Sequence, residues 1–259
     1  MANYINKYTN IDAYNADDGK QYPNVSYLVA TDELKYSNPI VYATFDVTSP
    51  TKINVTYNPA AFAKIELDGQ EIELVDTNKY DFGAKGKYTL KYTLANETEI
   101  SDKSWGWCYQ LIDMSNIPKT VTSIGVCAFL GCQFSDFIIP NSVTTIGSSA
   151  FSYCSKLTSM EIPNSVTEIG TCAFMACSKL TSVEIPNSVT SIGSDVFYTC
   201  YSMTSITIQA TTPPTLSSTR AFSEANNCLI YVPAESVDAY KAATNWSSLA
   251  DRIQPIPTE

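Results

Sequence analysis

Residues 139–154 read IPNSVTTIGSSAFSYC, and the same phrase returns at 162–177 as IPNSVTEIGTCAFMAC and at 185–200 as IPNSVTSIGSDVFYTC. Counted on their prolines, these copies and an earlier one are separated by 22, 23 and 23 residues (Pro118, Pro140, Pro163 and Pro186). A fixed period of about 20 to 30 residues is typical of solenoids, in which each repeat packs only on its neighbours. The repeat therefore predicts the fold of more than half of the chain.

One copy, residues 157–177, indicates how a coil begins. Met160 and Ile162 alternate with polar residues, which predicts a half-buried strand. Pro163-Asn164-Ser165 follows with turn chemistry, because proline ends a strand ladder and Asn and Ser can bond their own backbone. A second short strand is expected at 166–169.

The rest of the coil is expected to bend and then to turn once as a helix. Gly170 is expected to permit the bend, and the segment from Cys172 to Cys177 places Ala, Phe and Cys at helical spacing. One coil cannot close a core by itself. Stacked coils should therefore bury Ile, Val, Phe, Cys and Leu as continuous columns, with neighbouring strands about 4.8 Å apart.

The array extends beyond its clearest copies. Thr98-Glu99-Ile100 and Trp105 match the same frame, so a degenerate first coil is expected to begin near Thr98. At the other end, Ala221-Phe222 and the strand-like residues 229–233 predict a distorted sixth coil after five clear ones. An insertion from Ala210 to Thr219 stretches this last coil.

Residues 234–259 have the composition of a cap. The segment 236–243 predicts a short helix, and Trp246, Leu249 and Ile253 can cover the open end of the core. An uncovered end would expose apolar columns and an unpaired edge strand, so a cap is physically required.

The region before the repeats, residues 37–97, is expected to be a small, immunoglobulin-like β-sandwich. Alternating apolar and polar residues predict strands at 40–47, 53–57 and 88–94. A hairpin is expected at 65–74, with Asp68-Gly69 as its turn.

Residues 1–36 are rich in Tyr and Asn, and two interpretations remain open. The segment is either an arm lying on the β-domain or an anchor that docks into a partner subunit, since tyrosine is favoured at interfaces. The candidate anchor residues are Tyr4, Tyr8, Tyr14 and Tyr22.

The repeats resemble the BspA-like (treponemal-type) leucine-rich repeats, whose pattern reads CxxLxxIxIPxSVTxIGxxAFxxC. The copy from Cys154 to Cys177 fits this frame, and the resemblance covers residues 98–233. The expected fold is thus mainly β with short helices: an N-terminal β-sandwich-like domain, then a leucine-rich-repeat solenoid with a C-terminal helical cap. The resemblance implies a surface-displayed adhesion or interaction protein, of the kind found in gut Bacteroidetes and their phages.

The eight cysteines could indicate disulfides or a metal site, but most follow the repeat. Five fall in register (Cys108, Cys132, Cys154, Cys177 and Cys200), and Cys127 and Cys172 share a second equivalent position. Column register favours buried free thiols acting as small apolar residues. Disulfides between coils remain an alternative. Zinc is disfavoured because the chain has no histidine.

Composition and charge disfavour several partners. The net charge of −10 repels nucleic acid and anionic membranes. No stretch reaches the roughly 20 apolar residues needed to span a bilayer, so membrane insertion is not expected. The first residues have no apolar core typical of a secretory signal. Either an export signal is missing from this chain or the protein reaches the outside as part of a virion.

An enzyme is not expected. Without histidine the chain lacks the usual general base for a Ser or Cys nucleophile. No phosphate-cradling glycine loop is present, and the recurring glycines are attributed to the bend in each coil. Neither a cofactor nor a metal is expected.

The candidate ligand face consists of the outward positions of the first strand in each coil. These are Asp136, Ile138, Ser159, Glu161, Ser182, Glu184, Ser205 and Thr207. Together they would form a shallow polar ladder suited to a glycan or a protein. The alternative is that they are ordinary solvated strand positions.

Two functions follow. The first is a virion-displayed phage subunit, in a head or tail fibre or as a decoration protein. Its arm would bind other structural subunits, and its solenoid would contact a host-surface protein or glycan. The second is a bacterial cell-surface adhesin of the same repeat family without its export signal. A homo-oligomer is compatible with either function.

Overall fold

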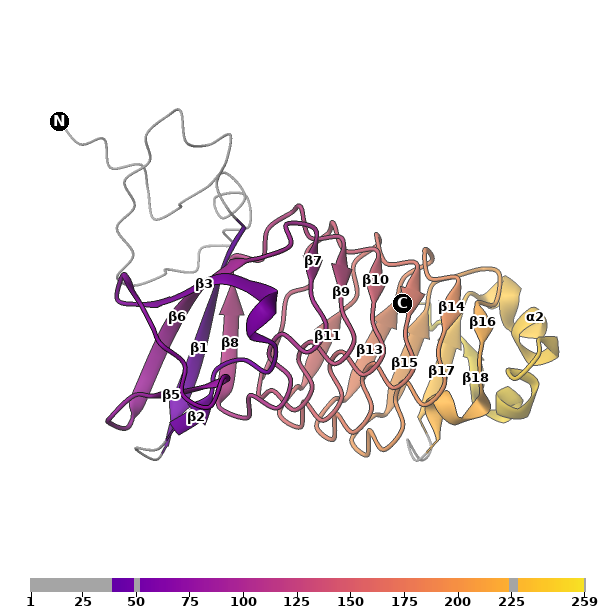
Figure 1. Ribbon diagram of the computed structural model, residues 1–259. Coiled ribbons are helices and arrows are strands. Elements are labelled where there is room, and N and C mark those ends of the chain that lie inside the picture. The colour runs from indigo at the N-terminus through magenta and orange to yellow at the C-terminus, as the bar shows by residue number, and fades with distance from the viewer. Residues whose placement is uncertain (1–38, 49–51, 224–227, 259) are drawn as a thin grey trace.

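The computed structural model describes residues 39–48, 52–223 and 228–258. An antiparallel sheet forms one end of the molecule, the coils stack beside it in a row, and helix α2 lies at the far end (Figure 1). The mainly β fold predicted from the sequence is confirmed. The candidate anchor residues Tyr4, Tyr8, Tyr14 and Tyr22 lie outside the described residues.

The N-terminal region contains a five-stranded sheet and a two-stranded ribbon. The sheet has the order β4-β3-β6-β1-β8, and the ribbon pairs β2 with β5. The strands are β1 (Ile40–Val47), β2 (Lys52–Asn54), β3 (Phe62–Leu67), β4 (Gln70–Glu71), β5 (Lys79–Asp81), β6 (Gly86–Leu94) and β8 (Leu111–Ser115), and the 3-10 helix η2 (Pro59–Ala61) precedes β3. Strict alternation along β1 buries Val41, Ala43, Phe45 and Val47 on one face.

The predicted hairpin is present as β3–β4, where Leu67 pairs with Gln70. Its turn residues Asp68 and Gly69 have φ angles of 52° and 78°. Positive φ at both central residues is what the type I′ turn requires, which explains the Asp-Gly pair.

The first coil is shared between the two parts of the chain. Its strand β8 pairs antiparallel with β1, so Tyr42 lies opposite Ser115. The sheet of the N-terminal region therefore contains a strand that follows the start of the repeats. The sequence did not predict this pairing, because the residues of β8 do not indicate which strand, more than 60 positions away, they pair with.

The solenoid is built from two parallel sheets. The β7–β16 sheet stacks six two-residue strands: β7 (Glu99–Ile100), β9 (Ser123–Ile124), β10 (Thr145–Ile146), β12 (Glu168–Ile169), β14 (Ser191–Ile192) and β16 (Thr215–Leu216). The β11–β18 sheet stacks β11 (Ser159–Glu161), β13 (Ser182–Ile185), β15 (Ser205–Ile208), β17 (Leu229–Val232) and β18 (Ile253–Pro255). The first sheet has six strands, with β7 in the segment expected as the degenerate first coil and β16 in the insertion expected in the distorted sixth.

The helical turn predicted for each coil is wrong. Cys172 and Ala176 have φ angles of 58° and 59°, which a right-handed helix excludes. In this segment every second N–H group donates to the next coil, as Phe174 does to the carbonyl of Val196 at 3.0 Å. The N–H groups in between bond three residues back within the coil, as Met175 does to Cys172 at 3.0 Å. Bonds between coils therefore alternate with single turns, and a continuous helix cannot form.

The repeated glycines are required by close packing between coils rather than by a bend. Gly147 and Gly170 do not have positive φ. A Cβ on Gly170 would lie 2.6 Å from the backbone nitrogen of Ser148 and 2.7 Å from the carbonyl carbon of Gly147. The expectation of a conformational role is thus corrected: the glycine column lets successive backbones approach each other.

The repeated Ser of the IPNS turn also acts between coils. The sequence suggested that its hydroxyl bonds the backbone of its own turn. In the structure the hydroxyl donates instead to a carbonyl of the preceding coil. Ser142, Ser165 and Ser188 reach Val121, Val143 and Val166 at 2.6, 2.6 and 2.7 Å. This ladder satisfies carbonyls along one edge of the stack.

A column of buried aromatic rings runs along the solenoid. Trp105, Phe129, Phe151, Phe174, Phe197, Phe222 and Trp246 follow one another, with centroids 5.2–6.0 Å apart. We call this column the aromatic spine. At its start, Trp105 also contacts Phe62 at 4.8 Å. The spine joins the N-terminal sheet, the coils and the cap in one core.

The cap contains helix α2 (Val237–Ala242), the 3-10 helices η3 (Thr219–Phe222), η4 (Ala234–Ser236) and η5 (Ser247–Arg252), and strand β18. Trp246 closes the spine, and its indole N–H donates to the carbonyl of Pro214 at 2.8 Å. Tyr240 donates to the carbonyl of Ala210 at 2.8 Å. Both acceptors belong to the insertion of the sixth coil, so the cap packs on this insertion.

Candidate binding surfaces

The β11–β18 sheet presents two rows of outward side chains across neighbouring strands. Ser159, Ser182 and Ser205 are register partners in the first row. Glu161, Glu184 and Thr207 are partners in the second, which Ile138 joins through a bridge to Glu161. The structure therefore brings these predicted residues together on one face, and the inward residues between them, such as Met160 and Val183, are buried.

The exposure of the predicted residues decreases toward the cap. Asp136, Ile138, Ser159, Glu161, Ser182 and Glu184 are exposed, whereas Ser205 and Thr207 are half-buried. Ile138, with 71% of its surface accessible, is the most exposed large apolar side chain among the described residues. Asp136 lies outside a strand, two residues before the bridge at Ile138.

The two rows continue further than the sequence indicated. Leu229 extends the serine row, and Tyr231 and Gln254 extend the glutamate row on β17 and β18. An IPxS motif does not follow β17, and β18 belongs to the cap, so the repeat pattern alone did not assign these residues to the face. The alternation of exposed and buried side chains along 229–232 was the one sequence feature that could have indicated them.

A polar hollow of about 480 Å³ lies at the end of these strands, beside the IPNS turns. Glu161 and Glu184 line it together with the turn residues Asn141, Asn164 and Ser165. Glu184 accepts a hydrogen bond from Nε2 of Gln209 at 2.9 Å. The two glutamates are register partners, so the face carries adjacent negative charges and is suited to a cationic partner group.

The in-register cysteines belong to the core, as predicted. Cys132, Cys154, Cys177 and Cys200 are fully buried, and each thiol donates to a carbonyl of the preceding coil at 3.2–3.3 Å. Burial raises the pKa of the Cys200 thiol to about 12. All eight cysteines are free, and among the residues that the structure describes no group of three or more His, Cys, Asp or Glu side chains could hold a metal ion.

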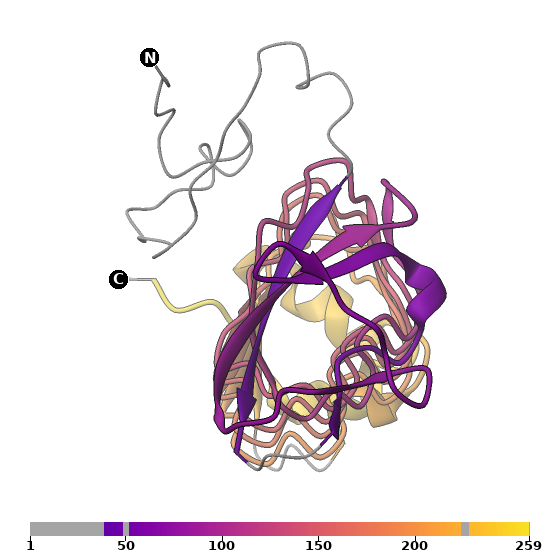
Figure 2. The same ribbon diagram turned by 60° about the vertical axis from the view of Figure 1, so that its left-hand side comes forward.

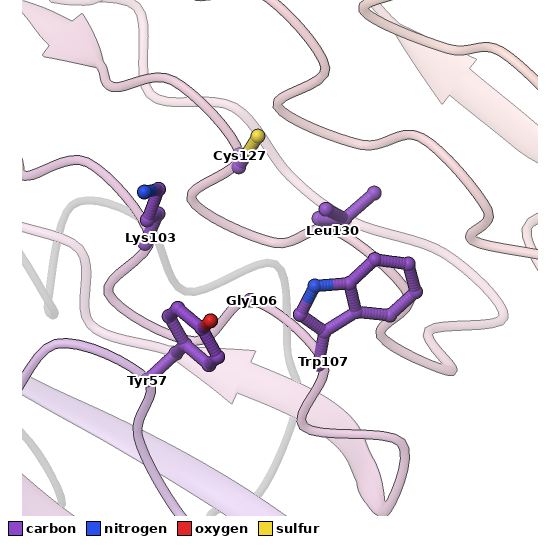
Figure 3. Close-up of a pocket in the computed structure, with 6 residues that line it drawn as sticks. All are labelled: Tyr57, Lys103, Gly106, Trp107, Cys127 and Leu130. Carbon is purple, nitrogen blue, oxygen red and sulfur yellow. The ribbon is translucent and has the colours of Figure 1, made fainter.

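A second surface, which the sequence did not reveal, lies on the turns that follow the strands of the β7–β16 sheet. We call this the turn side, and the surface covers its first coils. Trp107, Tyr109 and Tyr153 form an aromatic cluster there, with centroid distances of 5.7 Å from Trp107 to Tyr109 and 6.2 Å from Trp107 to Tyr153. Beside it a pocket is lined by Tyr57 and by residues of the first two coils (Figure 3). The repeat pattern could not indicate this surface, because its residues meet only after the coils stack.

The family of the repeats follows from a match over half of the chain. The model of the BspA type leucine-rich repeat region matches residues 98–228 in six copies. The chain belongs to the BspA-type leucine-rich repeat family. This confirms the resemblance seen in the sequence, and the six matched copies agree with the six strands of the β7–β16 sheet.

The BspA-type chain is similar to several solved structures. A leucine-rich repeat protein of T. pallidum is 27% identical over 52% of this chain and 62% of that chain, with a TM-score of 0.45. A leucine-rich repeat protein of Bacteroides ovatus is 26% identical over 52% and 46%, with a TM-score of 0.31. A leucine-rich cell surface protein of Faecalibacterium prausnitzii is 24% identical over 62% and 58%, with a TM-score of 0.30.

The BspA-type chain spans less than two thirds of the length of each of these structures. Because the TM-scores lie below 0.5, family membership rests on the repeat match and not on the superpositions. A search of curated proteins finds no match to the chain. Within the described ranges, none of the helices is both long and apolar enough to cross a bilayer.

Proposed function

We propose that this BspA-type protein is a non-catalytic adhesion protein of the bacterial cell surface, and that the outward face of its β11–β18 sheet binds a protein on a host surface. The observation that carries the proposal is the pair of side-chain rows on that face. Backbone pairing from β11 to β18 fixes their spacing, so the face is already ordered before a partner arrives.

The composition of the face favours a protein partner. Glu161 and Glu184 supply negative charge, while Ile138 and Leu229 supply exposed apolar area at its two ends. A polar surface with apolar contact points is typical of interfaces between proteins that also exist separately. Solenoids use such extended surfaces for binding, since neighbouring repeats present equivalent positions at a regular spacing.

Membership of the BspA-type family agrees better with a cell-surface adhesin than with a virion subunit. The virion function was the first of the two functions expected from the sequence. Neither the comparisons nor the described residues offer an observation that favours it. We therefore carry forward the cell-surface function.

The test is binding of the full chain to immobilised host extracellular-matrix proteins and mucins, measured by biolayer interferometry. The double variant Glu161→Lys/Glu184→Lys reverses the charge of the face while keeping two like charges as register partners. We expect it to bind at least about tenfold more weakly, since reversing charges across an interface removes electrostatic complementarity.

The matched control is Glu168→Lys, which reverses an exposed charge on β12 in the other sheet. It should bind like the wild type. Binding that is unchanged in the double variant, or equally lost in the control, would contradict the assignment of the face. Absence of binding to every immobilised protein would contradict the adhesion function itself, and binding to released mucin glycans alone would replace the protein partner by a glycan.

A further inference from the structure

The pocket on the turn side is small and lies where the N-terminal region meets the coils. Its volume is about 220 Å³, and it is lined by Tyr57, Lys103, Gly106, Trp107, Cys127 and Leu130. Figure 3 shows Tyr57 and Trp107 on either side of Gly106, with Lys103 and Cys127 beyond them. The pocket is smaller than the roughly 300–1,000 Å³ of sites for drug-sized ligands, so it suits one small ring.

The pocket is held by hydrogen bonds between segments distant in sequence. The backbone N–H of Tyr57 donates to the carbonyl of Ser104 at 3.2 Å, and the hydroxyl of Thr56 donates to the same carbonyl at 2.7 Å. Asn58 donates to the carbonyl of Asp102 at 2.9 Å. These bonds fix the backbone at Tyr57 against the first coil, so this residue lies at the pocket before a ligand binds.

Gly106 keeps the floor of the pocket open. It is buried between the two rings, and a Cβ at this position would lie 3.0 Å from the carbonyl oxygen of Cys127. The contact is tight, so a larger residue would have to displace the backbone of the next coil. The absence of a side chain leaves the ring faces of Tyr57 and Trp107 accessible from the pocket.

The apolar surface continues from the pocket over the next two coils. Trp107 contacts Tyr109 and Tyr153, which are 54% and 47% exposed. Gly131 makes this possible, because its Cα carries no side chain where a Cβ would lie 3.1 Å from both the Trp107 and the Tyr109 ring. A strip of aromatic rings therefore leads away from the pocket.

Three polar groups at the pocket lack a hydrogen-bond or ion-pair partner among the described residues. The indole N–H of Trp107 and the phenolic hydroxyl of Tyr57 have no hydrogen-bond partner in the part of the chain that the structure describes, and Lys103 is exposed there without an ion pair. The indole and ammonium groups are donors only, and the phenol can donate or accept. A ligand that pairs with all three needs several oxygen acceptors around an apolar face.

We propose that this pocket and the aromatic strip form a saccharide site, which takes one pyranose ring between Tyr57 and Trp107 and further sugar rings along Tyr109 and Tyr153. The C–H face of a pyranose packs on aromatic rings, and its hydroxyl and ring oxygens accept from the indole, ammonium and phenol groups. An aromatic side chain of a protein partner would fill the same space but leave these donors unpaired, at a cost in affinity.

The site shares no residue with the β11–β18 face, and its ligand does not depend on the function proposed for that face. A host glycoprotein could engage both. The two proposals fail separately, because the Glu161→Lys/Glu184→Lys variant should bind sugars like the wild type.

The first experiment is acrylamide quenching of tryptophan fluorescence in the full chain. Trp105 and Trp246 are 0% and 1% exposed, so the quenchable emission comes from Trp107. Galactose, N-acetylglucosamine, glucuronic acid and N-acetylneuraminic acid serve as probes at millimolar concentration. We expect at least one of them to protect Trp107 from acrylamide. If Trp107 cannot be quenched before any sugar is added, the chain itself covers the site and the proposal is overturned.

The second experiment measures saturation-transfer NMR on the protecting sugar with variants that keep the fold. Trp107→Phe retains a ring but removes the N–H, and should weaken binding about three- to tenfold, the effect of one hydrogen bond. Tyr57→Ala removes one ring face and should abolish the signal. Tyr201→Ala removes an aromatic that is 65% exposed elsewhere on the turn side, and should change nothing.

Three results would overturn the saccharide site. The first is that none of the four sugars gives a transfer signal. The second is that Trp107→Phe and Tyr57→Ala bind sugar as tightly as the wild type. The third is that a tyrosine-containing tripeptide protects Trp107 while the sugars do not, which would assign the pocket to a protein partner.

Discussion

At the scale of single residues, Gly170 shows how each coil constrains the next. A methyl group at this position would lie within 2.6–2.7 Å of the backbone of the preceding coil. The backbone cannot move without breaking the bonds between coils, so we expect Gly170→Ala to lower the free energy of unfolding by about 1–3 kcal/mol or more, as other overpacked sites do.

Urea denaturation followed by circular dichroism measures this effect. The control is Thr171→Ala, an exposed position in the same coil, which should stay within about 0.5 kcal/mol of the wild type. Equal stability of Gly170→Ala and the wild type would contradict the close approach of the coils.

The thiols provide a second test at this scale. Burial raises the pKa of the Cys154 and Cys177 thiols far above the ordinary value of 9.0, and both side chains are inaccessible. Since the thiolate is the reactive form, iodoacetamide at about pH 8 should leave them unmodified in the native protein. Cys127 and Cys172, which are only half-buried, should be the first to react.

Peptide mass spectrometry after a time course of labelling decides this, with the urea-unfolded protein as the reference for full reactivity. If Cys154 or Cys177 were labelled as fast as Cys127, the in-register cysteines would be open to solvent. That result would contradict their burial in the core.

The sequence identified which residues recur but misassigned what some of them do. The glycines and the serines of the IPNS turn were interpreted within one coil, where a bend and a turn are their ordinary roles. Their contacts instead run to the preceding coil, as Gly170 and Ser165 show. The periodicity predicted that coils stack, but not which atoms meet.

At the scale of elements, the aromatic spine is the feature most sensitive to a single change. Phe174 is fully buried between Phe151 and Phe197, with centroids at 5.5 and 5.6 Å and nearly parallel rings. Phe174→Ala leaves a cavity at two coil interfaces, so we expect a loss of about 3–5 kcal/mol in the free energy of unfolding.

Chemical denaturation again gives the measurement, with Tyr201→Ala as the control because this side chain is 65% exposed. A loss below about 1 kcal/mol for Phe174→Ala would mean that the coils do not depend on the spine.

The N-terminal sheet contains a charge cluster with a defined pH dependence. Glu66 on β3 lies 3.0 Å from Lys64 and 2.9 Å from Lys91. Burial raises the pKa of its carboxyl, but the hydrogen bonds and charges of Lys91 and Lys64 outweigh burial, so the pKa falls below its ordinary value of 4.5. The stabilisation is therefore present above about pH 4.5 and is lost as the pH falls through the lowered folded-state pKa.

We expect Glu66→Gln to be less stable than the wild type at about pH 7, and the difference to shrink toward about pH 3. Thermal unfolding at a series of pH values measures it, and taking the difference between the two proteins removes the contribution of the other carboxylates. A difference that grows on acidification would have the wrong sign.

Local rules predicted the elements that local residues determine. The Asp68-Gly69 hairpin and the strand β1 follow from turn chemistry and alternation, and both are present. The helical turn at 172–177 was wrong because hydrogen bonds between coils compete with those within one. The pairing of β8 with β1 depends on the whole fold, so the sequence of β8 alone could not indicate it.

At the scale of the whole molecule, the number of repeats and the rows of equivalent outward positions were predicted from the period, since equivalent positions on stacked coils must align. The cap was predicted because an open end would expose the core. The saccharide site does not follow from the period. Tyr57 lies in the N-terminal region, and Trp107 belongs to the degenerate first coil, so no repeat relates them. Both candidate surfaces depend on the same continuous core, which runs along the aromatic spine from the N-terminal sheet to the cap. Figure 2 shows the corresponding path of the backbone, with the N-terminal strands in front and the coils and helix α2 behind them.

The most direct test of the adhesion function is hydroxyl-radical footprinting of the full chain with and without the immobilised host protein that it binds. Ile138 and Leu229 lie on the β11–β18 face and are exposed in the free protein, whereas Tyr201 is exposed on the turn side. We predict that the partner protects Ile138, Leu229 and Tyr231 from oxidation and leaves Tyr201 unchanged. Protection of Tyr201 with full oxidation of Ile138 and Leu229 would contradict the account.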